Sequence, residues 1–403
     1  MTRRTCLVVW VAVLCGCREA DTPLTQLCTL PAGTQVPQLL AGPDSQPVLA
    51  FVQIDESGGR THAFQCMTWS GNGWENLATV GTDTSMLVNW ADRPQLAFGR
   101  DGQAFGHWLT LDDRGDFVYS ISTVRSEDGG RTWSNPTRPH NDTAVAEHGF
   151  AKWLPTEQGA CLVWLDGRDF DGHPDPSQAR MEVRMNCWPQ GDSWQTEVVL
   201  DSSACTCCPV TVAPTSDTEY ELIYRDREPG EIRDFSRMNI DASAGTWASL
   251  GTLHRDGWEI AGCPVNGAAL VGNGQRFLAS WYTAANNEPR ILAAWREAGA
   301  ASFDEPTTQH TFDPLGRVDV AVDGRGHFYS VWLQANSTGG VDWVGMHWDN
   351  FGNPVRMGPE ILVAASEQRA GGFPALTGLD EGVLLAWTNP RPSPHVMTAV
   401  WRP

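Results

Sequence analysis

Apolar residues along this chain gather in short runs with the reach of β-strands, and polar or turn-forming residues separate the runs. Representative runs lie at 48–51, 161–164, 222–224 and 383–387; they are rich in β-branched and aromatic residues and bounded by Gly, Asp, Asn and Pro. Asn-Gly and Asp-Gly pairs, which favour tight turns, lie between runs at 72–73, 101–102, 273–274 and 323–324. Beyond the N-terminus no window has a helical period, so the sequence predicts an all-β protein.

The runs belong to a unit that recurs seven times. Each unit pairs a small or turn-prone anchor with a strand that ends in an aromatic residue about fifteen positions later. The anchors are Pro37, Pro94, Gly149, Pro209, Pro264, Val318 and Pro374, and the aromatics are Phe51, Trp108, Trp164, Tyr224, Trp281, Trp332 and Trp387. Successive anchors are 57, 55, 60, 55, 54 and 56 residues apart, as is typical of repeat architectures. The pattern predicts a β-propeller of four-stranded blades, seven by repeat count, with six as the alternative.

The ends of the chain are predicted to meet in one blade. The last unit stops after three strands, at Trp401, while residues 24–30 precede the first unit. We expect 24–30 to supply the missing outer strand and close the ring, which hides sheet edges. Although 403 residues would ordinarily favour two or three domains, the repeat indicates a single domain over 24–403. Most of the 19 tryptophans should pack between blades.

The first 17 residues have the pattern of a processing segment. They contain Arg3 and Arg4, an apolar stretch at 7–14 and the box Leu14-Cys15-Gly16-Cys17. This segment resembles a bacterial lipoprotein signal peptide, which implies lipidation of Cys17 and a short tether over 18–23; an ordinary secretory signal is the alternative. Arg18 is not the Asp associated with inner-membrane retention, so the resemblance implies a lipid-anchored protein of the bacterial cell envelope, at the outer membrane.

The net charge restricts the classes of partner that we expect this protein to bind. Loss of Arg3 and Arg4 leaves 26 basic against 48 acidic residues, a net charge of −22. Such a surface repels nucleic acid and anionic lipid, so we expect no nucleic-acid partner and no membrane contact beyond the anchor. The expected partner is a glycan or an envelope protein, the expected state is a monomer, and no cofactor is expected.

Eight cysteines follow Cys17: Cys28, Cys66, Cys161, Cys187, Cys205, Cys207, Cys208 and Cys263. An even number in an exported chain favours disulfides. Cys208 and Cys263 precede the anchor prolines of consecutive units and are predicted partners; Cys161 with Cys187, and Cys28 with Cys66, are the other predicted pairs. A thiolate site for zinc or Cu(I) is the alternative at 205–208 with Cys263, where four sulfurs gather. Disulfides are the prediction, and no metal is expected.

One short motif carries a family resemblance. Ser126-Glu127-Asp128-Gly129-Gly130-Arg131-Thr132-Trp133 fits Ser-x-Asp-x-Gly-x-Thr-Trp without a mismatch. Asp128 should cap its own turn, Gly130 should take positive φ and Trp133 should pack beneath the next strand. The motif resembles the Asp-box of bacterial sialidases, which are six-bladed propellers in which the box is structural. A degenerate copy lies at 241–247 and a remnant at 70–74.

The resemblance implies a catalytic set that this chain only partly contains. Sialidases need three arginines on a substrate carboxylate, a tyrosine nucleophile with a glutamate partner, and an aspartate acid/base. The first family arginine lies in an Arg-Ile-Pro phrase, where this chain has Gln35-Val36-Pro37; Arg93-Pro94 is one blade later and one residue shorter. Residues 205–234 and 258–267 also resemble a broader group of exported sialidase-like propellers, which names no substrate.

In propellers, loops at one end of the channel and the starts of inner strands carry ligand contacts. The candidate catalytic residues follow the aromatic strands: Asp166, Arg168, Arg225, Asp226, Arg233 and Tyr282. Asn266, Arg317 and Asp319 are the further candidates for binding. Arginines suit a carboxylate or sulfate, and paired carboxylates suit glycoside cleavage. Ion pairs between blades are the structural alternative for the same residues.

The sequence therefore predicts a lipid-anchored, sialidase-like propeller that binds a glycan or protein without catalysis. The alternative is an exo-glycoside hydrolase acting on an acidic sugar, with Arg168, Arg225 and Arg233 on the carboxylate and Tyr282 or an aspartate reacting. A metal or redox role of the cysteines is a third hypothesis.

Overall fold

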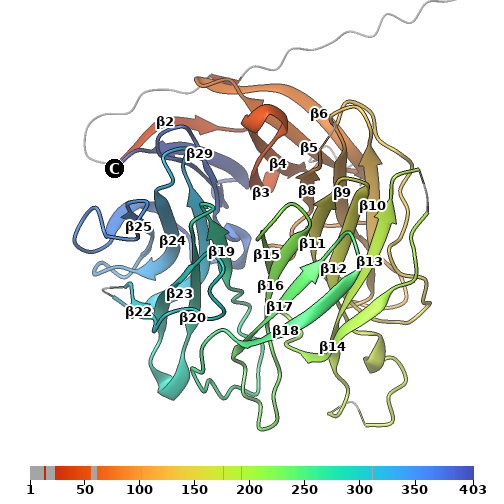
Figure 1. Ribbon diagram of the computed structural model, residues 1–403. Coiled ribbons are helices and arrows are strands. Elements are labelled where there is room, and N and C mark those ends of the chain that lie inside the picture. Colours follow the sequence, from red (N-terminus) through yellow and green to blue (C-terminus); the bar gives the residue numbers. More distant parts are fainter. Residues whose placement is uncertain are drawn as a thin grey trace, which may run out of the picture.

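The computed structural model describes residues 13–14, 23–55, 61–100, 102–175, 177–191, 193–310 and 312–403. Seven antiparallel sheets lie around a common axis, each forming one blade (Figure 1). This confirms the all-β propeller and its seven blades over the six-bladed alternative. Apart from the short strand β1 (Val13–Leu14), the predicted signal peptide lies outside the described residues, as do Cys17 and tether residues 18–22.

In five blades the strands follow one another from the axis outward in chain order. The exceptions are blade 2, in which two short strands pair with the same edge of one neighbour, and blade 7, whose outer strand comes from the start of the chain. Blades 1 to 3 contain β3 (Thr34–Ala41), β4 (Pro47–Gln53), β5 (His62–Trp69) and β6 (Gly73–Asp83), to which β1 pairs; β7 (Met86–Leu87), β8 (Gln95–Phe98), β9 (Ala104–Leu111) and β10 (Tyr119–Ser126); and β11 (His148–Thr156), β12 (Gly159–Asp166), β13 (Met181–Pro189) and β14 (Val198–Ala204). Blades 4 to 6 contain β15 (Thr211–Pro214), β16 (Glu219–Arg225), β17 (Phe235–Asp241) and β18 (Thr246–Thr252); β19 (Ala269–Gly272), β20 (Arg276–Thr283), β21 (Arg290–Glu297) and β22 (Thr307–Thr308); and β23 (Pro314–Val322), β24 (Phe328–Ala335), β25 (Val341–Trp348) and β26 (Glu360–Ala364). Blade 7 contains β27 (Ala375–Gly378), β28 (Val383–Asn389), β29 (His395–Trp401) and β2 (Leu24–Thr29).

Helix is almost absent from the described part of the chain. The 3-10 helices are η1 (Pro43–Ser45), η2 (Arg168–Phe170), η3 (Ala285–Asn287) and η4 (Arg369–Gly371). Within the described ranges, no helix has the length and apolar character that crossing a membrane requires.

Strand β2 closes the ring. It pairs antiparallel with β29, with Leu24 opposite Trp401, and so forms the outer strand of blade 7 (Figure 1). The chain then enters blade 1, where the Thr34 hydroxyl accepts a hydrogen bond from the Val396 N–H at 2.9 Å. The predicted role of residues 24–30 is confirmed, and the first and last blades are tied together.

Buried tryptophans fill the space between blades, as their recurrence predicts. Among the described residues, seven tryptophans are at most 1% exposed: Trp74, Trp108, Trp164, Trp281, Trp332, Trp343 and Trp401. Glycines make room for two of them: a Cβ at Gly81 would lie 2.5 Å from the Trp108 ring, and one at Gly345 would lie 2.5 Å from the Trp401 ring. Adjacent sheets therefore approach closely at these points, which lets large rings bury most of their area.

The Asp-box forms the turn that follows β10. The Asp128 carboxylate accepts hydrogen bonds from the N–H groups of Arg131 and Thr132 and from the Thr132 hydroxyl, at 2.7–3.0 Å. The bond from that hydroxyl is the main cause that lowers the pKa of Asp128 to about 2. Gly130 has a φ of 85°, and Trp133 packs against the apolar cluster around Trp108. The expected roles of Asp128 and Gly130 are confirmed, whereas the residues that Trp133 packs against belong to strands before the motif.

The disulfides match the predicted pairs only in part. Cys161–Cys187 is confirmed, and its residues lie directly opposite each other in β12 and β13. Cys263 is bonded to Cys207, so its predicted pairing with Cys208 is wrong by one residue. Cys207 lies in a turn and is partly exposed, like its surface partner, whereas Cys208 turns into the interior, where it is 1% exposed.

The predicted Cys28–Cys66 pair is also wrong. Cys28 is disulfide-bonded, whereas Cys66 is a buried free thiol. The two side chains belong to different cores: Cys28 packs with β28 and β29 residues of blade 7, and Cys66 packs toward Trp108 and Val124 of blade 2.

Candidate binding site at the arginine and cysteine face

The inner strands start on one face of the ring, which we call the upper face. Their far ends surround a cavity of about 1130 Å³ at the opposite mouth of the channel. Near their starts the channel narrows to a cavity of about 60 Å³. Asp166, Arg225 and Tyr282 lie at or near the ends of second strands, which run back to the upper face. The predicted site residues therefore share a face, but they fall into separate groups.

Arg225 is a buried clamp between blades 4 and 5. Nε and Nη2 donate to the Asn266 main-chain oxygen at 3.1 and 3.0 Å, Nη1 donates to that of Arg233 at 2.6 Å, and Nη2 donates to that of Tyr282 at 2.9 Å. The guanidinium lies over the rings of Phe235 and Trp258, at 4.0 and 4.8 Å from their centroids. Since all three nitrogens bind main-chain oxygens, Arg225 acts on the fold and not on a ligand carboxylate in this conformation.

Arg233 keeps unused donors. Its Nη2 donates to Glu231 at 2.5 Å, while Nε and Nη1 are buried with no hydrogen-bond partner in the described part of the chain. Glu231 also accepts from Arg227 at 2.8 Å, and the hydrogen bonds from Arg227 and Arg233 lower its pKa to about 2. Arg233 is only 5% exposed, so its spare donors point into the interior of the site.

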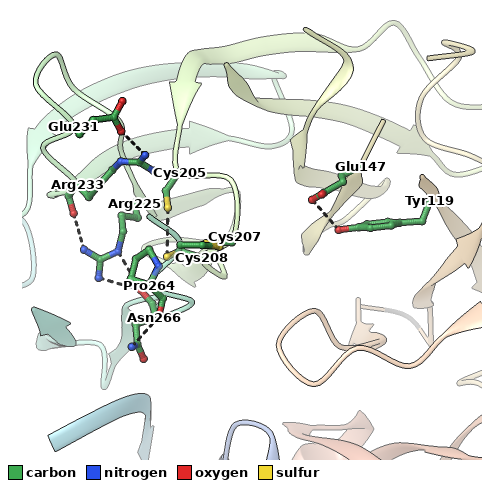
Figure 2. The surroundings of a disulfide bond; sticks show 11 residues. Tyr119, Glu147, Cys205, Cys207, Cys208, Arg225, Glu231, Arg233, Pro264 and Asn266 are labelled. Atoms are coloured by element: carbon green, nitrogen blue, oxygen red, sulfur yellow. Dashed lines mark hydrogen bonds and ion pairs between the residues drawn. A yellow bond between two sulfur atoms is a disulfide. The ribbon is translucent and has the colours of Figure 1, made fainter. Parts of the chain in front are cut away.

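A cluster of cysteines lies beside these arginines (Figure 2). The Sγ atoms of Cys205 and Cys208 are 3.6 Å apart, and each residue is 1% exposed. Cys207 brings a third sulfur within 4.8 Å of both, although that sulfur is bonded to Cys263. The sequence placed these sulfurs together correctly but not their pairing.

Asn266 and Arg317 join blades instead of facing an open pocket. The Asn266 Oδ1 accepts the Arg317 N–H at 2.8 Å, and Asn266 Nδ2 donates to the Pro264 oxygen at 3.2 Å. The Arg317 guanidinium donates to the main-chain oxygens of Glu367, Gln368 and Gly372 at 3.0–3.2 Å. Burial lowers the pKa of Arg317 to about 10.

Asp166 and Arg168 form another group, in blade 3. The Arg168 guanidinium donates to Asp166 at 2.7 and 2.8 Å and to Glu197 at 2.6 and 3.0 Å, and it lies 3.1 Å from Asp142. Burial opposes ionisation of Asp166, but the hydrogen bonds from Arg168 outweigh it and lower the pKa of that carboxyl. This guanidinium is therefore paired with the protein's own carboxylates.

Asp226 and Asp319 are held by the fold as well. Asp226 accepts the Ser236 hydroxyl at 2.6 Å, and burial raises the pKa of its carboxyl. Asp319 lies inside the channel, where its Oδ2 accepts the Leu376 N–H at 2.8 Å; burial raises the pKa of Asp319 although Arg93 opposes this. Arg93 donates to the Pro37 and Pro374 oxygens at 2.8 and 3.2 Å.

Asp92 lies in the same buried charge group and should give the protein a measurable pH dependence. Its Oδ2 accepts the Phe150 N–H at 2.7 Å, and burial raises its pKa to about 7. Because this pKa is above the unfolded value, the native state holds the extra proton, and stability falls as pH rises from about 4 to 7, by roughly 1.4 kcal/mol per unit. We expect the stability difference between Asp92→Asn and wild type to grow in favour of the variant by roughly 2–3 kcal/mol from pH 5 to pH 8, measured by urea unfolding.

The comparison must use that difference, because neighbouring groups titrate as well. Burial raises the pKa of Asp319 and of Glu147, in the same sense as Asp92, whereas two basic neighbours titrate in the opposite sense. Burial lowers the pKa of His107 to about 3 and that of Lys152 to about 8. Each of these contributions rises with pH and is present in both proteins. If the difference in the free energy of unfolding between variant and wild type were the same at pH 5 and pH 8, Asp92 would not titrate as described.

A hydroxyl–carboxylate pair was missed by sequence reasoning. Tyr119 at the start of β10 donates to Glu147 Oε2 at 3.1 Å, across the junction of blades 2 and 3 (Figure 2). Tyr119 is 5% exposed, and burial raises the pKa of its hydroxyl. No motif links these residues, which lie 28 positions apart; the nearest signal is the position of Glu147 just before the anchor Gly149.

Comparison with known proteins shows which fold this chain shares with solved structures. No protein-family model and no curated protein sequence matches this chain. Among solved structures, the BP39L lectin from Burkholderia pseudomallei is similar with a TM-score of 0.56 and 13% identity, over 92% of this chain and 96% of the lectin. The likeness shows a shared propeller fold. A variant of the NanB sialidase from Streptococcus pneumoniae (TM-score 0.48, 10% identity, 89% and 83% covered) and an α-L-arabinanase from Penicillium chrysogenum (0.48, 10%, 97% and 98%) are further structural neighbours.

Proposed function

We propose that this protein is a binding propeller that holds a glycan at its upper face without hydrolysing it. The observation that carries the proposal is the engagement of the predicted arginines. Arg168, Arg225 and Arg317 donate to carboxylates or main-chain oxygens of the protein itself. A sialidase-like reaction needs arginines whose forked donors are open to a substrate carboxylate.

The propeller similarity to a lectin supports a carbohydrate partner over a protein partner. Arg233 is the member of the predicted set with spare donors, and it lies in the loop between β16 and β17 at this face. We therefore assign it the contact to an acidic or sulfated group of the glycan, since guanidinium donors suit such groups.

Anchoring at Cys17, the outer-membrane location and the monomeric state belong to the same proposal. The support for the anchor and location is the Leu14-Cys15-Gly16-Cys17 box and Arg18.

A glycoside hydrolase is the second candidate, favoured by one observation. The Tyr119 hydroxyl and the Glu147 carboxylate form the kind of pair that a tyrosine nucleophile uses. Burial raises the pKa of this hydroxyl, however, which opposes its activation as a nucleophile. The pair therefore ranks below the binding function.

The test combines a glycan array with a panel of fluorogenic acidic and neutral glycosides. We expect wild type to bind acidic glycans, Arg233→Met to lose most of that binding, and no glycoside to be cleaved. Arg100→Met is the matched control, because Arg100 is an exposed arginine at the β8–β9 turn on the opposite face, paired with Glu157 and Asp217. Hydrolysis that Tyr119→Phe abolishes would establish the enzyme instead, and loss of binding in Arg100→Met alone would move the site to the other face.

A further inference from the structure

Two thiols are left over at the upper face once the disulfides are assigned. Cys205 and Cys208 are free, with their Sγ atoms 3.6 Å apart, while Cys207 between them is tied to Cys263. The spacing is Cys-x-x-Cys, a sequence signal that the neighbouring Cys207 obscures. Both thiols are 1% exposed, but Cys263 lies at the surface, so the pair sits just beneath the solvent-exposed disulfide.

The surroundings favour negative charge on sulfur. The guanidinium groups of Arg225 and Arg233 act on Cys205, and the N–H groups of Cys207 and Asn266 are directed at Cys205 and Cys208 respectively. Arg233 also keeps two buried nitrogens without a partner in the described part of the chain.

We propose that Cys205 and Cys208 bind one Cu(I) ion as a buried dithiolate site, with Arg233 balancing the charge of the complex. Binding forms two Cu–S bonds and releases the two thiol protons to solvent, so no electron is transferred. The complex of one monovalent cation with two thiolates carries a single negative charge. A neighbouring guanidinium with unused N–H donors stabilises such a charge in a buried setting.

Coordination number selects the metal. Thiolates prefer soft ions such as Cu(I) and also bind zinc. A structural zinc site needs four ligands in a tetrahedron, and the sulfurs of Cys207 and Cys263 are already bonded to each other. Glu231, the nearby carboxylate, is paired with Arg227 and Arg233. Two thiolates therefore leave zinc incompletely coordinated but suffice for Cu(I), which accepts a low coordination number.

The competing outcome is a third disulfide. Sulfur atoms 3.6 Å apart need little movement to bond, given an oxidising partner such as a thiol–disulfide oxidoreductase. A thiol count on aerobically purified protein distinguishes the states. Cys66, Cys205 and Cys208 are the free thiols among the described residues, and a Cys205–Cys208 bond lowers the count by two.

The experiment is an anaerobic titration of the full chain with Cu(I) supplied as its bathocuproine disulfonate complex, after mild reduction that mass spectrometry shows to leave the Cys207–Cys263 bond intact. We expect one Cu(I) per chain to be withdrawn from the chelator. Cys205→Ser and Cys208→Ser should each weaken binding by more than the roughly 10–100-fold that the loss of an outer-shell partner costs. Cys66→Ser is the matched control, since Cys66 is another buried free thiol, and it should bind as wild type does.

Several results would overturn the proposal: wild-type affinity in Cys205→Ser and Cys208→Ser, loss of copper in Cys66→Ser, or a Cys205–Cys208 disulfide whose reduced form takes no copper. Zinc binding of equal affinity with the Cys207–Cys263 bond intact would overturn the assignment of the metal. If the serine variants do not fold, X-ray absorption of copper-loaded wild type decides, because nitrogen or oxygen neighbours in place of two sulfurs would exclude the site. None of these copper measurements depends on glycan binding.

Discussion

Replacing Glu221 with leucine is expected to lower the free energy of unfolding by about 3–5 kcal/mol. Glu221 in β16 is 1% exposed, and its carboxylate binds the guanidinium of Arg237 at 2.6 Å and that of Arg296 in the next blade. Arg237 and Arg296 are 2% and 6% exposed, so removal of the acid leaves two buried cations without a counter-charge. Urea unfolding at neutral pH measures the loss.

The control is Glu219→Leu on the same strand and the same side of the sheet. Glu219 is partly exposed and its carboxylate accepts one hydrogen bond, from Asn239 at 3.1 Å, so its replacement should cost about 1 kcal/mol or less. A triple variant in which Glu221 becomes leucine and both arginines become methionine should recover most of the loss, because it removes the uncompensated charge. Equal effects of the two single variants would show that burial of the triad does not decide its contribution.

The repeat made most of this fold predictable. Strand formation depends on local alternation of apolar and polar residues, and the same alternation recurs behind anchors such as Pro209 and Pro264. The missing fourth strand after Trp401 was visible because the other units set the expected count, and β2 fills that place. Repetition thus turned a weak local signal into a reliable count of blades.

The candidate site was less predictable, because many of its contacts are made to main-chain oxygens or to residues of a neighbouring blade. Neither kind of partner can be recognised in the sequence. The acceptors of Arg225 are main-chain oxygens of Arg233, Asn266 and Tyr282, and any residue types there would supply them. Tyr119 and Glu147 meet only because blades 2 and 3 pack together. The partner of Cys263 depends on whether Cys207 or Cys208 faces outward. The equivalence of positions in consecutive blades, on which the sequence prediction was based, does not determine that choice.

Removing the Cys207–Cys263 disulfide should cost about 4 kcal/mol, since it closes a segment of 56 residues. The double variant Cys207→Ser with Cys263→Ser avoids a new free thiol. The bond joins the loops that lead into β15 and β19, at the upper junction of blades 4 and 5, and its loss removes no strand pairing. The variant therefore differs from wild type mainly in the greater conformational freedom of its unfolded chain. Chemical unfolding in non-reducing buffer measures the change, and a loss below about 1 kcal/mol would contradict the loop-entropy account.

The Cys161–Cys187 bond provides the internal comparison. It closes 26 residues within blade 3, between strands that already pair with each other, so Cys161→Ser with Cys187→Ser should cost slightly less, about 3.5 kcal/mol. The Cys207/Cys263 variant has a second use, because it keeps Cys205 and Cys208. If that variant still binds one Cu(I) ion, the disulfide and the metal-binding thiols act independently, although they belong to one cluster. If copper binding disappears with the disulfide in a folded protein, the bond itself must position the dithiol, and the two effects are coupled.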